Sequence, residues 1–256
     1  MSISKRYLFH MFIKSSVFII SILAASSAIA DGNTTYQSFN KAKKTLMKSV
    51  YAEEANRQTI YCAATFDIKK NVTPPAGFTS KTHVKRSKRI EFEHIVPAQN
   101  FGQAFKEWRE GHPECVTKKG KSFKGRNCAG KINVDYRYMQ ADMFNLYAAI
   151  GSVNALRSNY NFQMVPGEKS DFGSCEMIID SRKAQPPEAA RGRIARAYLY
   201  MDQAYNNYSV SKQQKQLMNA WDKQYPITEK ECVRAELISK LQGNVNSIIE
   251  DRCNGT

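Results

Sequence analysis

One stretch of the chain combines ionisable side chains with an apolar, strand-like run: Glu91-Phe92-Glu93-His94-Ile95-Val96-Pro97-Ala98. Strand side chains alternate, so we expect His94 on one side of the strand and Glu93 on the other. A strand that only packs would not carry charge at its centre, because an unpartnered buried charge is costly. We therefore expect a chemical site at this segment, with Pro97 marking the end of the strand.

His94 is the histidine best placed for catalysis among the four in the chain. His10 belongs to the N-terminal segment, His83 lies in a run of Lys and Arg, and His112 lies in a Gly-His-Pro turn. A lone strand histidine is more often a packed residue than a catalyst. The adjacent Glu93 and the basic flanks favour catalysis, because perturbed ionisable groups gather at functional sites.

Residues 1–30 have the pattern of a secretory signal peptide. A basic start precedes an apolar run over residues 17–25, and Ala28-Ile29-Ala30 is a small-x-small cleavage motif before Asp31. The apolar run is short for a membrane anchor. We expect export to the periplasm or the medium, no stable membrane association after cleavage, and a mature chain of residues 31–256.

Six cysteines in an exported chain predict up to three disulfides. Cys115 and Cys128 are closest in sequence and are expected to close the Lys/Gly-rich loop between them. The other four, Cys62, Cys175, Cys232 and Cys253, allow three pairings that the sequence does not separate. No Cys-x-x-Cys spacing supports a zinc site instead.

The chain is strongly basic, with a formal net charge of +15. The expected signal peptide carries three of these charges (Lys5, Arg6 and Lys14) and no acidic residue, which leaves +12 in the mature chain. Two basic clusters, residues 81–89 and 118–126, flank the Glu93-His94 segment. Clustered charge favours a polyanionic partner such as nucleic acid over a merely soluble surface.

The pattern along the chain predicts one compact α+β domain. We expect a helix from Ser38 to about Glu54, strands and turns over residues 62–98, a loop region over 101–137 and a helix over about 139–157. The C-terminal third is predicted to be helical, with helices opening at Pro186-Pro187, Ser211 and Thr228.

Three ordered motifs resemble the bacterial endonuclease I family, which are exported, nonspecific nucleases. They are Glu93–Gly102 (EHIVPAQNFG), the block from Asp142 to Asn159 (DMFNL, AIGSVN and RSN), and Leu241–Asn246 (LQGNVN). The resemblance covers most of the mature chain and implies a ββα-metal (His-Me finger) core flanked by helices.

The resemblance also implies roles for individual residues. Glu93 and Asn145 would hold one divalent metal, most simply Mg²⁺ with Ca²⁺ or Mn²⁺ as alternatives, since Mg²⁺ needs only one or two protein oxygens. His94 would be the general base, and Arg126 would stabilise the transition state. One departure is visible: the family often has Tyr-Cys-x-Cys where this chain has Tyr61-Cys62-Ala63-Ala64, so the family's full disulfide set cannot form.

The resulting prediction is a monomeric, metal-dependent endonuclease that cuts DNA, and also RNA, through backbone phosphates to give 5′-phosphate products. The alternative is a non-catalytic basic periplasmic protein that binds nucleic acid or other polyanions. A metallopeptidase is poorly supported, because the chain has no His-Glu-x-x-His motif.

Overall fold

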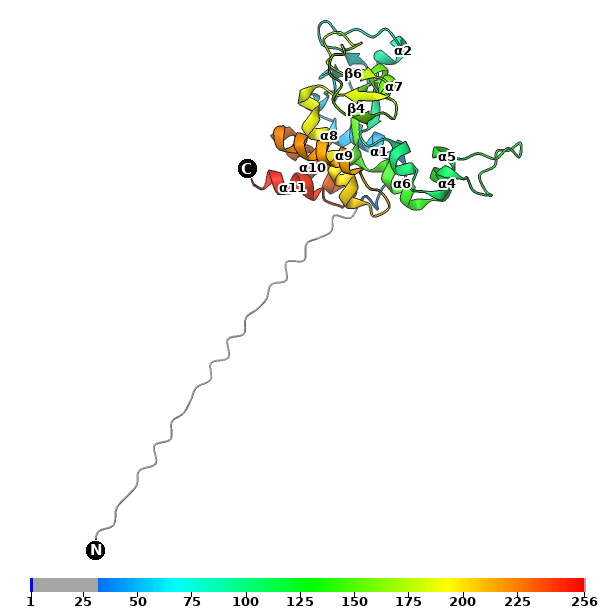
Figure 1. The fold of residues 1–256 in the computed structure, drawn as a ribbon, viewed down its shortest axis with the longest axis vertical. Helices are drawn as coiled ribbons and strands as arrows, with labels where there is room; N and C mark the ends of the chain where they lie inside the picture. The colour runs from blue at the N-terminus through cyan, green and yellow to red at the C-terminus, as the bar shows by residue number, and fades with distance from the viewer. Residues whose placement is uncertain (2–31, 256) are drawn as a thin grey trace.

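The structure is a computed structural model that describes Met1 and residues 32–255, so the predicted signal peptide lies outside the described residues. Helices and strands are mixed along the chain, which confirms the α+β class (Figure 1). The N-terminal half contains these elements: α1 (Phe39–Thr45), η1 (Leu46–Val50), η2 (Glu54–Asn56), β1 (Thr65–Phe66), β2 (Val72–Thr73), α2 (Val84–Ser87), β3 (Ile90–His94), α3 (Ala98–Gly102), α4 (Lys106–Arg109), α5 (Arg126–Ile132) and α6 (Val134–Ala141). The remaining elements are η3 (Met143–Asn145), β4 (Leu146–Ile150), α7 (Gly151–Arg157), β5 (Asn161–Phe162), β6 (Ile178–Asp180), β7 (Lys183–Gln185), α8 (Glu188–Ala204), α9 (Lys212–Gln224), α10 (Glu229–Gln242) and α11 (Ser247–Cys253).

The centre of the fold is an antiparallel pair of strands followed directly by a helix. β3 pairs with β4 from Ile90↔Ile150 to His94↔Leu146, and α7 begins at the residue after β4. Gly151 is required at this junction, because a Cβ atom there would lie 2.5 Å from the carbonyl oxygen of Arg86. The absence of a side chain lets the start of α7 approach α2, so the helix packs beside the strand that carries His94.

The helix predicted over residues 139–157 is wrong. Its middle is strand β4, whose five residues are all buried, between α6 with η3 on one side and α7 on the other. Asp142 ends α6, and its side chain accepts a hydrogen bond from the backbone N–H of Phe144 at 3.0 Å. A short apolar run fits a buried strand as well as one face of a helix, and pairing with β3 decides between the two.

The loop predicted over residues 101–137 is also wrong, since α4, α5 and parts of α3 and α6 lie there. These helices are too short to show a clear helical spacing of apolar residues, and the segments between them are rich in glycine and charged residues. The N-terminal helix is confirmed as α1 with η1, with the hydroxyl of Ser38 accepting from the N–H of Lys41. The three predicted C-terminal helices are confirmed as α8, α9 and α10, although Thr228 makes no side-chain cap. The three-stranded sheet β5-β7-β6 was not predicted.

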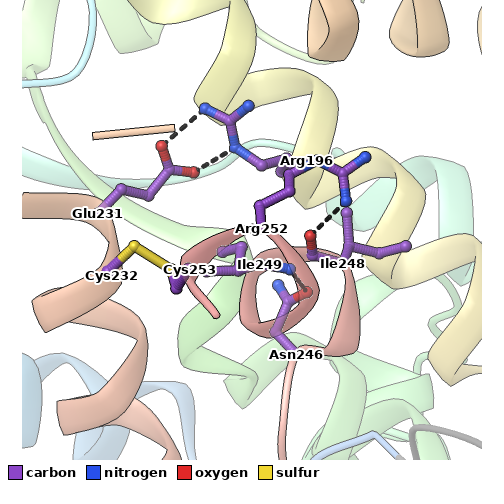
Figure 2. The surroundings of a disulfide bond; sticks show 8 residues. All are labelled: Arg196, Glu231, Cys232, Asn246, Ile248, Ile249, Arg252 and Cys253. Carbon is purple, nitrogen blue, oxygen red and sulfur yellow. Dashed lines mark hydrogen bonds and ion pairs between the residues drawn. A yellow bond between two sulfur atoms is a disulfide. The ribbon is translucent and has the colours of Figure 1, made fainter. Parts of the chain in front are cut away.

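The C-terminal helices form a layer beneath the strand pair (Figure 1). Arg196 on α8 is buried and forms a bidentate ion pair with Glu231 of α10, with both nitrogen–oxygen distances 2.7 Å (Figure 2). Arg196 also donates to Asp222 of α9 at 3.1 Å, and Asp222 in turn pairs with Arg252 of α11. One buried guanidinium thus joins three helices of the layer.

Three disulfides are present among the described residues: Cys62–Cys175, Cys115–Cys128 and Cys232–Cys253. The predicted Cys115–Cys128 pair is confirmed, and the structure selects one of the three pairings left open for the other four cysteines. Cys232–Cys253 fastens α11 to α10 next to the Arg196–Glu231 pair (Figure 2). Within residues 32–255, no helix has both the length and the apolar character that crossing a bilayer requires.

Candidate active site

A cleft of about 830 Å³ opens where the end of β3 meets α7, α1 and α5. Both Glu93 and His94 line it, although their side chains leave the strand on opposite faces. Because β3 ends at His94, side chains from both faces of the strand border the cleft at the end of the strand. Basic side chains dominate the charge of the lining: Lys43, Lys70, Lys85, Arg86, Arg89 and Arg126. A concave site with this charge suits a phosphate-bearing substrate.

The imidazole of His94 is buried and lies beside two aromatic rings. The ring centroid of Phe39 lies 4.6 Å from that of His94, and that of Phe101 lies 6.1 Å away. Nε2 of His94 is 2.8 Å from the carbonyl oxygen of Gln140. A carbonyl oxygen only accepts, so Nε2 carries the proton and Nδ1 keeps its lone pair.

Burial lowers the pKa of His94 to about 3, and the positive charge of Arg126 adds to the effect. The imidazole is therefore neutral near neutral pH. A neutral ring with a fixed tautomer can accept a proton at Nδ1, which is what a general base requires.

One carboxylate oxygen of Glu93 is fixed by two donors. Oε1 accepts from the hydroxyl of Tyr61 and from Nη1 of Arg157, both at 2.7 Å. Oε2 accepts no hydrogen bond from the part of the chain that the structure describes. Burial raises the pKa of Glu93, and the charge of Arg157 opposes this shift. The side chain is held rigidly while one oxygen stays available to the cleft.

Arg157 is fully buried and organises the chain after β3. Its Nη1 donates to the carbonyl oxygen of His94 at 2.8 Å, and its Nη2 donates to that of Ile95 at 2.6 Å. The guanidinium also lies 4.3 Å from the ring centroid of Phe162. Because the same nitrogen binds Glu93, Arg157 sets the position of the carboxylate and of the strand end together.

Asn145 does not line the cleft. Its side chain is fully buried; Oδ1 accepts from the N–H of Val96 at 2.8 Å, and Nδ2 donates to the carbonyl oxygen of Val96 at 3.0 Å. Both ends of the amide hold the backbone beyond β3. The structure therefore does not bring Asn145 together with Glu93 at the cleft, and its geometry gives the predicted ligand role no support.

Asn154 on α7 lines the cleft instead, and its role was missed in the sequence. Its Nδ2 donates to Oε2 of Glu91 at 2.8 Å, and Nε of Arg86 donates to Oε1 of the same carboxylate at 2.7 Å. These contacts hold the Nδ2 end of the Asn154 amide against Glu91. The other end, Oδ1, accepts no hydrogen bond from the described residues. One feature of the sequence could have pointed to Asn154. Asn154 and Arg157 are three residues apart, which puts them on one face of a helix, and Glu91 and Glu93 are two apart, which puts them on one face of a strand.

Arg126 also lies at the cleft, as the first residue of α5. Its guanidinium carbon is 5.1 Å from the ring centroid of Phe39, the ring that also contacts His94. Cys128, two residues further on, is in the Cys115–Cys128 disulfide. The structure thus brings Arg126, His94 and Glu93 to one site, as the sequence predicted.

The donor set fits a hard divalent cation with few protein ligands. No cluster of three or more His, Cys, Asp or Glu side chains suited to a metal occurs within the described residues. Oε2 of Glu93 and Oδ1 of Asn154 are cleft-lining oxygens that accept from no donor in this part of the chain. Mg²⁺ typically uses one or two such oxygens and takes the rest from water and phosphate.

Comparisons with known proteins find relatives that match most of the chain. The family model described as Endonuclease I matches residues 24–253. An extracellular deoxyribonuclease of Aeromonas hydrophila is 39% identical over 85% of this chain and 91% of its own length. A periplasmic deoxyribonuclease of the same organism is 38% identical over 85% of this chain and 87% of its own. Endonuclease-1 of Buchnera aphidicola (subsp. Baizongia pistaciae) is 32% identical over 93% and 95%, respectively.

Proposed function

The chain belongs to the endonuclease I family and is an endonuclease, and from this premise we propose that it is exported and hydrolyses DNA, and also RNA, with a divalent metal ion. The observation that carries the proposal is the meeting of a neutral histidine, an arginine and two available ligand oxygens in one basic cleft. Family membership favours this prediction over the alternative of a non-catalytic polyanion-binding protein.

We assign the metal to Oε2 of Glu93 and Oδ1 of Asn154, and Mg²⁺ is the ion we expect. When bound, the ion would neutralise charge on the phosphoryl oxygens and on the leaving oxygen. Asn145 is not retained as a ligand, since its amide is committed to Val96. Within the fold, β3, β4 and α7 would be the two strands and the helix of the ββα-metal core.

In the proposed reaction, Nδ1 of His94 takes a proton from a water molecule, and the water oxygen attacks phosphorus in line. The bond between phosphorus and the 3′ oxygen breaks, and this oxygen gains a proton from solvent. The products are a 5′-phosphate and a 3′-hydroxyl. The carbonyl of Gln140 holds the ring orientation and stabilises the imidazolium that forms.

Arg126 would place positive charge against the phosphoryl group as negative charge develops on it. Burial, together with the charge of Arg126, lowers the pKa of His94, so the ring is in its basic form before substrate binds. The remaining cationic side chains of the lining would bind backbone phosphates. Such contacts carry no base information, so cleavage is expected to lack sequence specificity.

Export is supported by the signal-like residues 1–30, the three disulfides and the names of the Aeromonas relatives. Disulfides persist in oxidising compartments such as the periplasm. We propose a monomer that acts in the periplasm or the medium.

A plasmid-nicking assay with metal removal tests the function. The purified protein should convert supercoiled plasmid to nicked and linear forms, stop after EDTA treatment and dialysis, and recover when Mg²⁺ is restored. Undiminished cutting after EDTA would refute the metal dependence. Absence of cutting with Mg²⁺, Mn²⁺ and Ca²⁺ alike would refute the nuclease activity itself.

A further inference from the structure

A hairpin-like arm formed by residues 116–124 projects from the body of the molecule. In Figure 1 it is the green loop that extends beyond α4 and α5. Val116 and Ser122 form an antiparallel bridge, and the N–H of Thr117 donates to the carbonyl oxygen of Lys121 at 2.8 Å. Gly120 closes the tip with φ +75°, a left-handed conformation that favours glycine. We call this segment the basic arm.

The base of the basic arm is fastened to the rest of the fold. The Cys115–Cys128 disulfide crosses it, and the N–H of Phe123 donates to the carbonyl oxygen of Cys115 at 2.8 Å. The N–H of Gly125 donates to the carbonyl oxygen of Trp108 on α4 at 3.0 Å. A segment with these constraints presents its side chains in a limited set of positions, which reduces the entropy lost when a ligand binds.

The charge of the basic arm is of one sign and is not neutralised within the protein. Its four lysines, Lys118, Lys119, Lys121 and Lys124, are exposed. None of them pairs with an acidic side chain among residues 32–255. The sequence has no acidic residue between Cys115 and Val134. Concentrated positive charge of this kind attracts polyanions and raises their local concentration.

The basic arm is continuous with the active-site cleft. Arg126 follows the arm after Gly125 and lines the cleft. Trp108, whose carbonyl oxygen accepts from the N–H of Gly125 at the base of the arm, lines the cleft as well. A polynucleotide with one phosphate at His94 can therefore pass Arg126 and reach the lysines outside. We propose that the basic arm binds the phosphate backbone of long substrates beyond the cleft, and this inference rests on the proposed nuclease function.

The inference predicts that the arm distinguishes substrates by length. A nucleic acid confined to the cleft would not touch the arm, whereas a long duplex would. Each lysine–phosphate pair that is removed should lower the salt dependence of duplex binding by about 0.9 in the slope of log K against log salt concentration. Removal of all four lysines should then reduce the slope by about 3.6 and weaken duplex binding ~10-fold or more at moderate salt.

The test compares three quadruple variants with the parent protein. One replaces the four arm lysines by Gln, and a second replaces them by Arg. The matched control replaces four exposed lysines that do not line the cleft, Lys183, Lys212, Lys223 and Lys230, by Gln. Cleavage of a duplex of about 30 base pairs and of a single-stranded tetranucleotide is measured for each. Binding of the duplex is measured by fluorescence anisotropy in a His94→Ala background over a salt series.

We expect the arm Gln variant to lose ~10-fold or more in kcat/KM on the duplex and to stay within about twofold of the parent on the tetranucleotide. The arm Arg variant should keep duplex cleavage, and the control variant should change both substrates little. Equal duplex binding and cleavage by the arm and control Gln variants would overturn the inference. If the parent cuts neither substrate, the proposed function fails, and the anisotropy series alone then decides whether the arm binds nucleic acid.

Discussion

Two side-chain pairs connect β3 to α7: Glu91 with Asn154, and Glu93 with Arg157. Glu91 and Glu93 are two residues apart on the strand, and Asn154 and Arg157 are three residues apart on the helix. Each spacing keeps its pair on one face, so the carboxylates meet the amide and the guanidinium in order. One oxygen of Glu93 and one of Asn154 accept from no donor within the described residues. The two oxygens that we propose as metal ligands therefore belong to side chains that other protein groups already orient.

Asn154→Ala and Asn145→Ala should affect different properties: the first metal affinity, the second stability. Asn154→Ala should weaken Mn²⁺ binding, measured by electron paramagnetic resonance, at least ~10-fold with little change in Tm, because changes at or next to a metal ligand act on affinity at about this scale. Asn145→Ala should instead lower the free energy of unfolding by about 1–3 kcal/mol, because the buried N–H and C=O of Val96 lose their partner. The reverse pattern would return the ligand role to Asn145.

Glu91→Gln tests whether Glu91 orients the amide of Asn154. A Gln side chain cannot accept at both positions from Arg86 and Asn154, so the amide should lose its fixed orientation. We expect the Mg²⁺ concentration for half-maximal activity to rise ~10-fold while the rate at saturating Mg²⁺ stays within a few-fold. An unchanged Mg²⁺ requirement together with unchanged Mn²⁺ binding would show that Glu91 has no such role.

The residues of the site were only partly predictable from the sequence. His94 and Glu93 stood out because ionisable side chains are unusual at the centre of a strand, whereas Arg126 was named through the family resemblance. The resemblance named Asn145 as the second ligand, and nothing in the sequence singled out Asn154, which is an amide in the same block of the chain. Which of them faces the cleft depends on β4 being a strand and α7 starting at Gly151, and this is a tertiary outcome.

At the scale of elements, α5 carries Arg126 at its first residue and Cys128 in its first turn. The disulfide to Cys115 therefore fixes the start of this helix relative to the base of the basic arm. The capped helices α1 and α9 were predictable from Ser38 and Ser211, whose side chains act locally. Short elements such as α4 and β4 were not, because their stability comes from packing and pairing rather than from their own sequence.

Replacing both Cys115 and Cys128 by Ser should affect activity more than folding. The pair closes a loop with a sequence separation of 13, for which the chain-entropy account gives about 3 kcal/mol of stabilisation. We expect the variant to remain folded by near-ultraviolet circular dichroism and to lose about 10-fold or more in plasmid cleavage, because Arg126 is no longer held. Full activity in this variant would show that the Cys115–Cys128 disulfide is not needed to hold Arg126 in position.

At the scale of the whole molecule, the layer of α8 to α11 packs against η1 and η3, which adjoin α1 and β4. The layer is held by the cluster of Arg196, Glu231, Asp222 and Arg252 and by the Cys232–Cys253 disulfide (Figure 2). None of these residues lines the cleft. They are expected to contribute to stability without taking part in the chemistry.

Arg196→Met should lower the free energy of unfolding by about 3–5 kcal/mol, because it leaves the buried carboxylates of Glu231 and Asp222 without this cation. Lys240→Gln, which removes an exposed pair with Glu236, is the matched control and should change it by less than about 1 kcal/mol. Urea denaturation measures both. A similar small change for the two variants would mean that the buried cluster does not hold the layer.

The most direct test of the central claim is the pairing of cleavage and binding in His94→Ala. The variant should lose at least about 100-fold in the single-turnover rate of plasmid nicking at saturating Mg²⁺, since general base catalysis contributes on this order. Its affinity for a duplex in the same buffer should stay within about twofold of the parent, because backbone phosphates are bound mainly by the cationic side chains. Nicking at the parental rate by a folded His94→Ala protein would contradict the assignment of His94 as the base.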